Sequence, residues 1–119
     1  MNLLAIGSKI TIRKICEEII DKVEIVNLVD FTNKNYLNWD LSRSSKVKYN
    51  SGNIEKIDTL IKSGLENTDI VIVHSNTDIE TLFIAQKSKI DTKKNIFVIL
   101  DDLSLASIYE PLGFIVLDS

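Results

Sequence analysis

The sequence predicts an α/β fold, a doubly wound and mostly parallel six-stranded sheet of order 3-2-1-4-5-6 with helices on both faces. Short apolar runs alternate with helix-patterned segments along the chain, which is typical of parallel strands joined by crossover helices. The runs are continuously apolar, as expected of strands covered on both faces. Right-handed crossovers then place helices on both sides. A flavodoxin-like strand order is the main alternative.

Composition limits the functions that fit this fold. The length of 119 residues suits one ordinary domain, so we expect residues 1–119 to form a single domain. A net charge of −3 with scattered lysines argues against a nucleic-acid partner. The sequence has neither a signal peptide nor an apolar run near the roughly 20 residues of a membrane span. We therefore expect a cytoplasmic protein without direct membrane insertion.

The first half of the chain predicts three strands. They comprise residues 3–6, 24–29 and 46–49. In segment 10–23 the apolar residues recur at helical spacing, which predicts a helix. Residues 31–44 fit either a short helix or an irregular connection. Their aromatic side chains either pack over a sheet edge or stack on bases, and the lack of accompanying basic residues favours packing.

The second half predicts three helices and three more strands. Ser51-Gly52-Asn53 has helix-start chemistry, and the helix that follows is expected to end at Gly64. The remaining strands comprise residues 69–73, 95–100 and 114–117, and the helices between them residues 79–86 and 105–112. Asp101-Asp102 is expected to cap the second of these helices, without a metal. Cys16, the single cysteine, is expected to be an inert core thiol.

Polar residues at the carboxyl ends of the strands are the candidates for ligand binding, because open parallel sheets bind ligands at that edge. They are Gly7, Ser8, Lys9, Asp30, Gly52, Asn53, His74, Ser75, Asn76, Asp101 and Asp102. Asp30 follows Gly7 by 23 positions. This is close to the usual spacing, roughly 20 residues, between the glycine turn and an acid that accepts hydrogen bonds from an adenosine ribose. His74 is the only histidine, and as a general base it would need Ser75 or Asp78 as a partner. Since no triad or metal set is visible, we expect no catalysis.

The phosphate-binding turn departs from its usual pattern. The pattern G-x-G-x-x-G would place glycines at positions 7, 9 and 12, and this chain has Gly7, Lys9 and Ile12. Lys9 either blocks approach of a pyrophosphate to the backbone, meets a phosphate as a cation at a helix start, or is simply solvated. The third glycine normally allows the helix to pack closely on the strand, so the side chain of Ile12 must either push the helix away from the strand or fill a space between them.

Collinear motifs along the chain carry a family resemblance. LLAIG precedes the step Ile15-Cys16-Glu17-Glu18-Ile19, Asp30 ends the second strand, and Gly52-Asn53 forms a later turn. Further motifs are Leu60 to Leu65 with Gly64, Thr68 to Ile72, and Ser75 to Thr81 with Asp78. In this order they resemble the N-terminal Rossmann subdomain of the TrkA-N (RCK) family, which regulates potassium channels and transporters.

The resemblance implies a regulatory domain that is not an enzyme, forms a homodimer and acts on a membrane potassium channel or transporter subunit. It implies NAD(H), ATP or ADP as ligand and no metal. By position in the family's motifs, the implied binding residues are Gly7, Ser8, Asp30, Gly52, Asn53 and Ser75. Lys9 joins these candidates as a cation at the helix start and not through the resemblance. Lys9, Ile12, Asn53 and Ile99 depart from the family pattern, and the family's C-terminal ligand subdomain has no counterpart here. The alternative is a pseudo-Rossmann interaction or dimerisation module that binds no nucleotide.

Overall fold

The computed structural model describes residues 1–90 and 94–119 and contains one parallel six-stranded sheet. Its order is β3-β2-β1-β4-β5-β6, with all five strand pairs parallel. The strands are β1 (Asn2–Ile6), β2 (Ile25–Asp30), β3 (Val47–Ser51), β4 (Ile70–Val73), β5 (Asn95–Leu100) and β6 (Ile115–Asp118). The predicted order 3-2-1-4-5-6 is confirmed, and the flavodoxin-like order is excluded.

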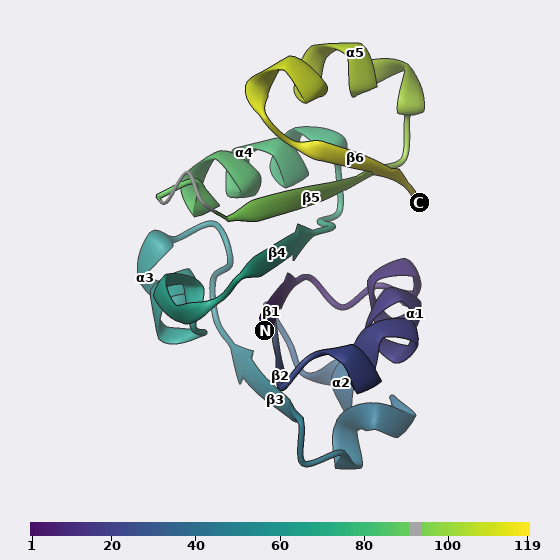
Figure 1. Ribbon diagram of the computed structural model, residues 1–119, viewed down its shortest axis with the longest axis vertical. Coiled ribbons are helices and arrows are strands. Elements are labelled where there is room, and N and C mark those ends of the chain that lie inside the picture. The colour runs from purple at the N-terminus through teal and green to yellow at the C-terminus, as the bar shows by residue number, and fades with distance from the viewer. Residues whose placement is uncertain (91–93) are drawn as a thin grey trace.

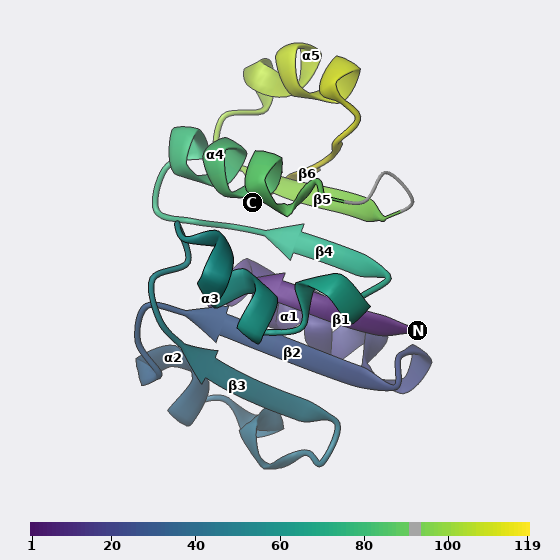
Figure 2. The ribbon, with the colours of Figure 1, turned by 90° about the vertical axis from the view of Figure 1, so that its left-hand side faces the viewer.

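Helices cover both faces of the sheet, as predicted. They are α1 (Ile10–Ile19), α2 (Lys34–Leu37), α3 (Ile57–Lys62), α4 (Asp78–Ser88) and α5 (Ala106–Tyr109). Short 3-10 turns comprise Ile20–Lys22, Asp40–Arg43, Leu65–Asn67, Leu103–Leu105 and Glu110–Leu112. Figure 1 shows α1 and α2 on one side of the sheet and α3 and α4 on the other. In Figure 2, α3 and α4 lie in front of the strands and α1 lies behind them.

The central strand β1 contributes to two separate apolar cores, one on each face. Leu4 and Ile6 belong to the core beneath α3, α4 and α5. Leu3 and Ala5 belong to the core beneath α1 and α2, together with Ile12 of α1. Burial on both faces explains why this strand is continuously apolar rather than alternating. Ile12 is fully buried, so it fills the space that the missing third glycine would leave.

Two local predictions differ from the structure. The first helix is shorter than predicted, because α1 ends at Ile19 and a 3-10 turn follows. Ser51-Gly52-Asn53 does not start α3, since Ser51 belongs to β3 and α3 begins only at Ile57. The side chain of Asn53 instead accepts a hydrogen bond from the Glu55 N–H at 3.0 Å. Asn residues stabilise turns and helix starts by the same bond, and here the bond forms in the turn.

Two aromatic residues of segment 31–44, Tyr36 and Trp39, pack against the body of the protein, whereas Phe31 is exposed. The segment forms α2 and a 3-10 turn. The Tyr36 ring stacks on Tyr49 of β3, with 4.6 Å between ring centroids. Trp39 is buried, and its indole N–H donates to Glu17 Oε1 at 2.9 Å. These contacts confirm the packing interpretation for Tyr36 and Trp39 rather than a base-stacking surface.

None of the helices in the described part of the chain is both long and apolar enough to cross a lipid bilayer.

Burial in α4 generates a matched stability prediction. Ile84 is fully buried, whereas Ile79 on the same helix is 79% exposed. We expect Ile84→Ala to lower the free energy of unfolding by about 2–5 kcal/mol, because it leaves a cavity in the core. Ile79→Ala should change it by no more than about 0.5 kcal/mol. Urea denaturation measures both values, and equal losses would contradict the described packing.

Candidate nucleotide site

Gly7 lies directly against His74, the residue that follows the neighbouring strand β4. Its φ of +101° lies in the left-handed region, and an added Cβ would lie 2.0 Å from the carbonyl oxygen of His74. Its N–H donates to the Val29 carbonyl of β2 at 2.8 Å. Glycine is therefore required here by contacts within the protein, independently of any ligand.

Ser8 and Asp30 connect the carboxyl ends of β1 and β2. The buried Ser8 hydroxyl donates to Asp30 Oδ2. The Phe31 N–H donates to Asp30 Oδ1 at 2.7 Å, and the Asn35 amide donates to Ser8 Oγ at 3.4 Å. These bonds orient the carboxylate, and each of its oxygens retains a further lone pair for a ligand hydroxyl.

The beginning of α1 offers positive charge to the same edge. Lys9 is the residue that precedes the helix, and no described side chain caps the first turn, which also contains no acid. The free N–H groups and the helix dipole of such a turn favour an anion. Lys9 adds a cation at this position.

Gly52 lies beside Asp30, whereas Asn53 and Ser75 form hydrogen bonds elsewhere. The Gly52 N–H donates to the Asp30 carbonyl at 3.0 Å. The Asn53 side chain accepts from its own turn. The Ser75 hydroxyl donates to Glu80 Oε2 at 3.0 Å, and the Ser75 N–H donates to Thr81 Oγ1 at 2.9 Å, both on α4. The structure thus links Ser8, Asp30 and Gly52 by hydrogen bonds. The side chains of Asn53 and Ser75 lie outside that group.

The side chain of His74 contacts Asp101 and not Ser75 or Asp78, the two partners that its neighbours in the sequence suggest. Its Nε2 lies 3.2 Å from Asp101 Oδ1, at the end of β5. The His74 side chain is 5% exposed, whereas that of Asp101 is 51% exposed. Asp78 accepts from the backbone N–H groups of Asp101 and Asp102, at 2.9 and 3.1 Å. Asp78 therefore orders the turn that carries Asp101, while Asp101 itself contacts the ring.

Burial and hydrogen bonds shift two pKa values in this pair. Burial is the largest cause of the lowered pKa of His74. The hydrogen bond with Asp101 raises this pKa in part, and the positive charge of Lys9 lowers it further. Hydrogen bonds from Ser119 and then His74 lower the pKa of Asp101. At neutral pH the pair is therefore a neutral imidazole beside an ionised carboxylate. Sequence reasoning missed this pair, although both residues follow neighbouring strands.

The remaining reactive side chains give no further chemistry. Burial raises the pKa of the Cys16 thiol to about 12, so this thiol stays protonated and unreactive. Asp102 accepts from the Ser104 N–H at 3.0 Å, which confirms it as a cap of the following turn. Within residues 1–90 and 94–119, no three His, Cys, Asp or Glu side chains group to hold a metal ion.

Three cavities of the described structure lie away from the Ser8–Asp30 contact. One of about 460 Å³ lies over β2 and β3 and is lined by residues that include Asn27, Asn50 and Ser63. Another, of about 450 Å³, separates α1 from the end of β6, and a third, of about 440 Å³, lies at the amino end of β4. Gly7, Ser8, Lys9 and Asp30 line none of these three. The candidate site is therefore distinct from these three cavities.

Comparisons with solved structures support this fold, whereas a scan against family models and a search of curated proteins found no match. The GsuK channel bound to NAD matches 98% of this chain at a TM-score of 0.78 and 12% identity. Shewanella denitrificans Kef CTD in its AMP-bound form matches all of it at a TM-score of 0.81 and 13% identity. The NAD(P)-binding domain of an exopolyphosphatase-related protein from Archaeoglobus fulgidus matches 97% at a TM-score of 0.76 and 15% identity.

These likenesses establish a Rossmann-like fold shared with an RCK domain, since a separate GsuK RCK structure also matches at a TM-score of 0.78. The chain spans about a fifth of the NAD-bound GsuK chain, because the match covers 21% of it. It spans 72% of the Kef chain and 85% of the Archaeoglobus chain.

The contact between Gly7 and His74 generates a second stability prediction. Gly113 has a similar φ of +95°, but an added Cβ there would meet only the flexible end of Lys89, at 3.1 Å. Gly113→Ala should therefore cost only the left-handed conformation, about 1–2 kcal/mol. Gly7→Ala also clashes with a backbone carbonyl and should cost at least about 1 kcal/mol more. Denaturation midpoints compare the two variants, and equal losses would show that the close approach is relieved elsewhere.

The lowered pKa of His74 predicts a dependence of stability on pH. The unfolded chain binds the His74 proton more readily than the folded protein, so protonation favours unfolding. The stability from this group is complete above the unfolded pKa of about 6.5 and is lost as pH falls through the folded pKa. We expect a lower free energy of unfolding at about pH 5.5 than at about pH 7.5, with a smaller difference in His74→Gln. An identical pH dependence in the variant would contradict the assignment to His74.

Proposed function

We propose that this chain is a non-catalytic regulatory domain that binds an adenine nucleotide at the carboxyl edge of its sheet. The arrangement that supports this proposal is the Asp30 carboxylate, oriented by Ser8 and the Phe31 N–H, at the same edge as the uncapped start of α1. A ribose diol donates hydrogen bonds and a phosphate accepts them. The edge therefore offers an acceptor and a set of donors in the combination that a nucleotide needs.

The ligand class follows from this pairing of groups. Asp30 would accept from the adenosine ribose hydroxyls, and the first turn of α1 with Lys9 would face the phosphates. NAD in GsuK and AMP in Kef both contain a ribose and a phosphate, which supports NAD(H), ATP, ADP or AMP as candidate ligands. Ser75, whose hydroxyl already donates to Glu80, would contribute through its position at the end of β4 rather than through that hydroxyl.

The departures from the glycine pattern suggest how the turn after β1 would contact phosphates differently from the usual glycine-rich turn. Lys9 stands where a second glycine would let a pyrophosphate approach the backbone. A cation at this position would neutralise the phosphate charge directly, in place of the close contact between phosphate and backbone that a glycine allows. Ile12 is buried in the core beneath α1, so the third position packs the helix onto the sheet and leaves the ligand edge to Lys9 and the first turn.

A regulatory role would require two states with unequal affinity for the nucleotide. We propose that the domain is cytoplasmic, forms a homodimer and biases a membrane potassium channel or transporter, as the resemblance to the RCK family implies. The likeness to a GsuK RCK domain and to Kef CTD supports this role.

A protein-interaction module without nucleotide is the second candidate. The observation in its favour is that Gly7, Ser8, Lys9 and Asp30 line none of the three cavities. In that case the β1–α1 turn would serve packing alone, because Gly7 is already required by the His74 carbonyl.

Thermal unfolding with millimolar NAD, NADH, ATP, ADP or AMP tests the proposal. A ligand at 100 times its dissociation constant adds about 2.7 kcal/mol of stability. For a domain of this size the unfolding midpoint should rise by roughly 10 °C or more. A midpoint unchanged by every nucleotide would remove the nucleotide site and favour the interaction module.

Charge reversal at Lys9 provides the matched variant for that experiment. We expect Lys9→Glu to reduce the shift produced by ADP and to leave the weaker effect of adenosine unchanged, because only ADP carries phosphates. Lys14→Glu makes the same charge change at an exposed position of α1 that lies beyond the first turn. It should reduce the ADP shift much less. Equal losses in the two variants would indicate general electrostatics rather than a phosphate contact.

A further inference from the structure

His74, which follows β4 directly, has one buried ring nitrogen that makes no hydrogen bond within the described chain. Nδ1 of His74 is buried and has no hydrogen-bond partner within the described chain. The other ring nitrogen, Nε2, lies 3.2 Å from Asp101. Because an ionised carboxylate only accepts, Nε2 must carry a proton, and Nδ1 of the neutral ring is then a bare acceptor. A buried acceptor left without a partner is costly, and such groups often have a functional explanation.

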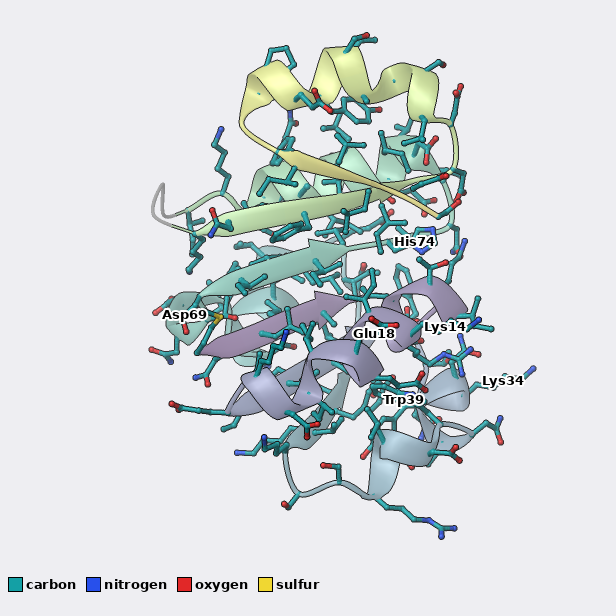
Figure 3. All side chains as sticks on the ribbon, turned by 45° about the vertical axis from the view of Figure 1, so that its right-hand side comes forward. Lys14, Glu18, Lys34, Trp39, Asp69 and His74 are labelled. Carbon is teal, nitrogen blue, oxygen red and sulfur yellow. The ribbon has the colours of Figure 1, made fainter. Side chains whose placement is uncertain are left out.

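The ring lies next to the proposed phosphate position. The carbonyl oxygen of His74 is the group that an added Cβ at Gly7 would strike, so its backbone touches the β1–α1 turn. Lys9 lies close enough for its charge to act on the imidazole. Figure 3 shows the His74 ring at the end of β4, beside the beginning of α1. Two independent features, an uncapped helix start and an unpartnered buried ring nitrogen, thus meet at one edge.

The charges around His74 decide which ligand would suit it. Lys9 at the start of α1 opposes a second positive charge, whereas Asp101 after β5 and Asp78 at the start of α4 favour one. A phosphate near Lys9 would cancel its repulsion and would also accept a hydrogen bond from a protonated Nδ1. The doubly protonated ring would then donate on both sides, to Asp101 and to the anion.

We propose that His74 couples ligand binding to proton uptake: when an anionic phosphate group occupies the start of α1, His74 takes up a proton at Nδ1 and donates a hydrogen bond from that N–H to the phosphate. The proton comes from solvent, so one O–H bond of a solvent hydronium breaks as the N–H bond forms, and the phosphate is not protonated. This inference rests on the proposed nucleotide site, which it extends by giving binding a dependence on pH. Affinity for the phosphate-bearing ligand rises as pH falls, since the protonated ring belongs to the bound state.

The single histidine makes this proton directly observable. We expect ¹H–¹⁵N spectra of the free protein at neutral pH to show a protonated Nε2 and an unprotonated Nδ1. NAD is the first probe, because its phosphodiesters keep their charge between about pH 5.5 and about pH 8. With saturating NAD the His74 pKa should rise, and each unit of the rise corresponds to a tenfold gain in affinity at low pH. Adenosine, which lacks phosphate, should leave the His74 pKa unchanged.

Calorimetry with His74→Gln supplies the second readout. The amide of Gln can still donate to Asp101 but does not titrate in this range. Wild-type protein should bind NAD more tightly at about pH 5.5 than at about pH 8, while the variant should bind it equally at both. If the variant fails to fold, the spectra of the wild-type protein still decide the question.

The outcomes separate this proposal from the nucleotide proposal. If NAD binds in a Lys9-dependent way and the His74 pKa stays constant or falls, proton coupling is wrong and the nucleotide site stands. A fall would mean that neutral Nδ1 accepts from a ligand hydroxyl. If no nucleotide binds but sulfate, compared with chloride, raises the His74 pKa, the anion contact stands without the nucleotide. If neither NAD nor sulfate moves it, the coupling is overturned.

Discussion

The contact between the turn after β1 and the turn after β4 is the constraint on which the ligand edge depends. The His74 N–H donates to the Ile6 carbonyl at 3.0 Å, and the His74 carbonyl lies where a side chain on Gly7 would project. The chain can leave β1 only in a left-handed conformation, which glycine alone adopts without strain. This conformation fixes where α1 begins. The same contact places the His74 backbone against the turn that leads into that helix, so the proposed ligand edge depends on the packing of this residue pair.

Strand order and helix placement could be predicted because they follow from short-range patterns and from general topological rules. The run Leu3 to Ile6 is apolar on both faces, and the structure buries Leu4 and Ile6 on one side and Leu3 and Ala5 on the other. A strand buried in this way must lie inside the sheet. Right-handed crossovers leave few other orders for such a chain. The prediction of a helix start at Ser51 to Asn53 is wrong because the chain closes a turn from Asn53 to Lys56 and enters α3 only at Ile57. The Asn53 side-chain bond to the Glu55 N–H serves a turn as well as a helix start, so the residue types alone do not distinguish the two.

For the candidate site, the sequence predicts which residues follow strands but not which of them contact one another. Ser8 and Asp30 were selected as residues that follow strands, yet their hydrogen bond depends on the register between β1 and β2. Ser75 was selected by the same rule, and its hydroxyl donates to Glu80 instead. The His74–Asp101 pair joins residues from neighbouring strands β4 and β5. A lone histidine at one strand end and an acid pair at the next were the available signals, but only the folded sheet brings them together.

Strand β3 gives the ligand edge an uneven rigidity. Only Val47 of this edge strand is buried, whereas β1 is buried from Leu3 to Ile6. The strand is held on one side by pairing with β2 and by the Tyr36–Tyr49 stack. Strands with few buried contacts open first in native-state fluctuations, on the scale that amide hydrogen exchange detects. Gly52, whose N–H bonds to Asp30, follows this strand directly. One side of the Asp30 environment therefore belongs to the buried centre of the sheet, and the other side moves with an edge strand that opens more readily than β1.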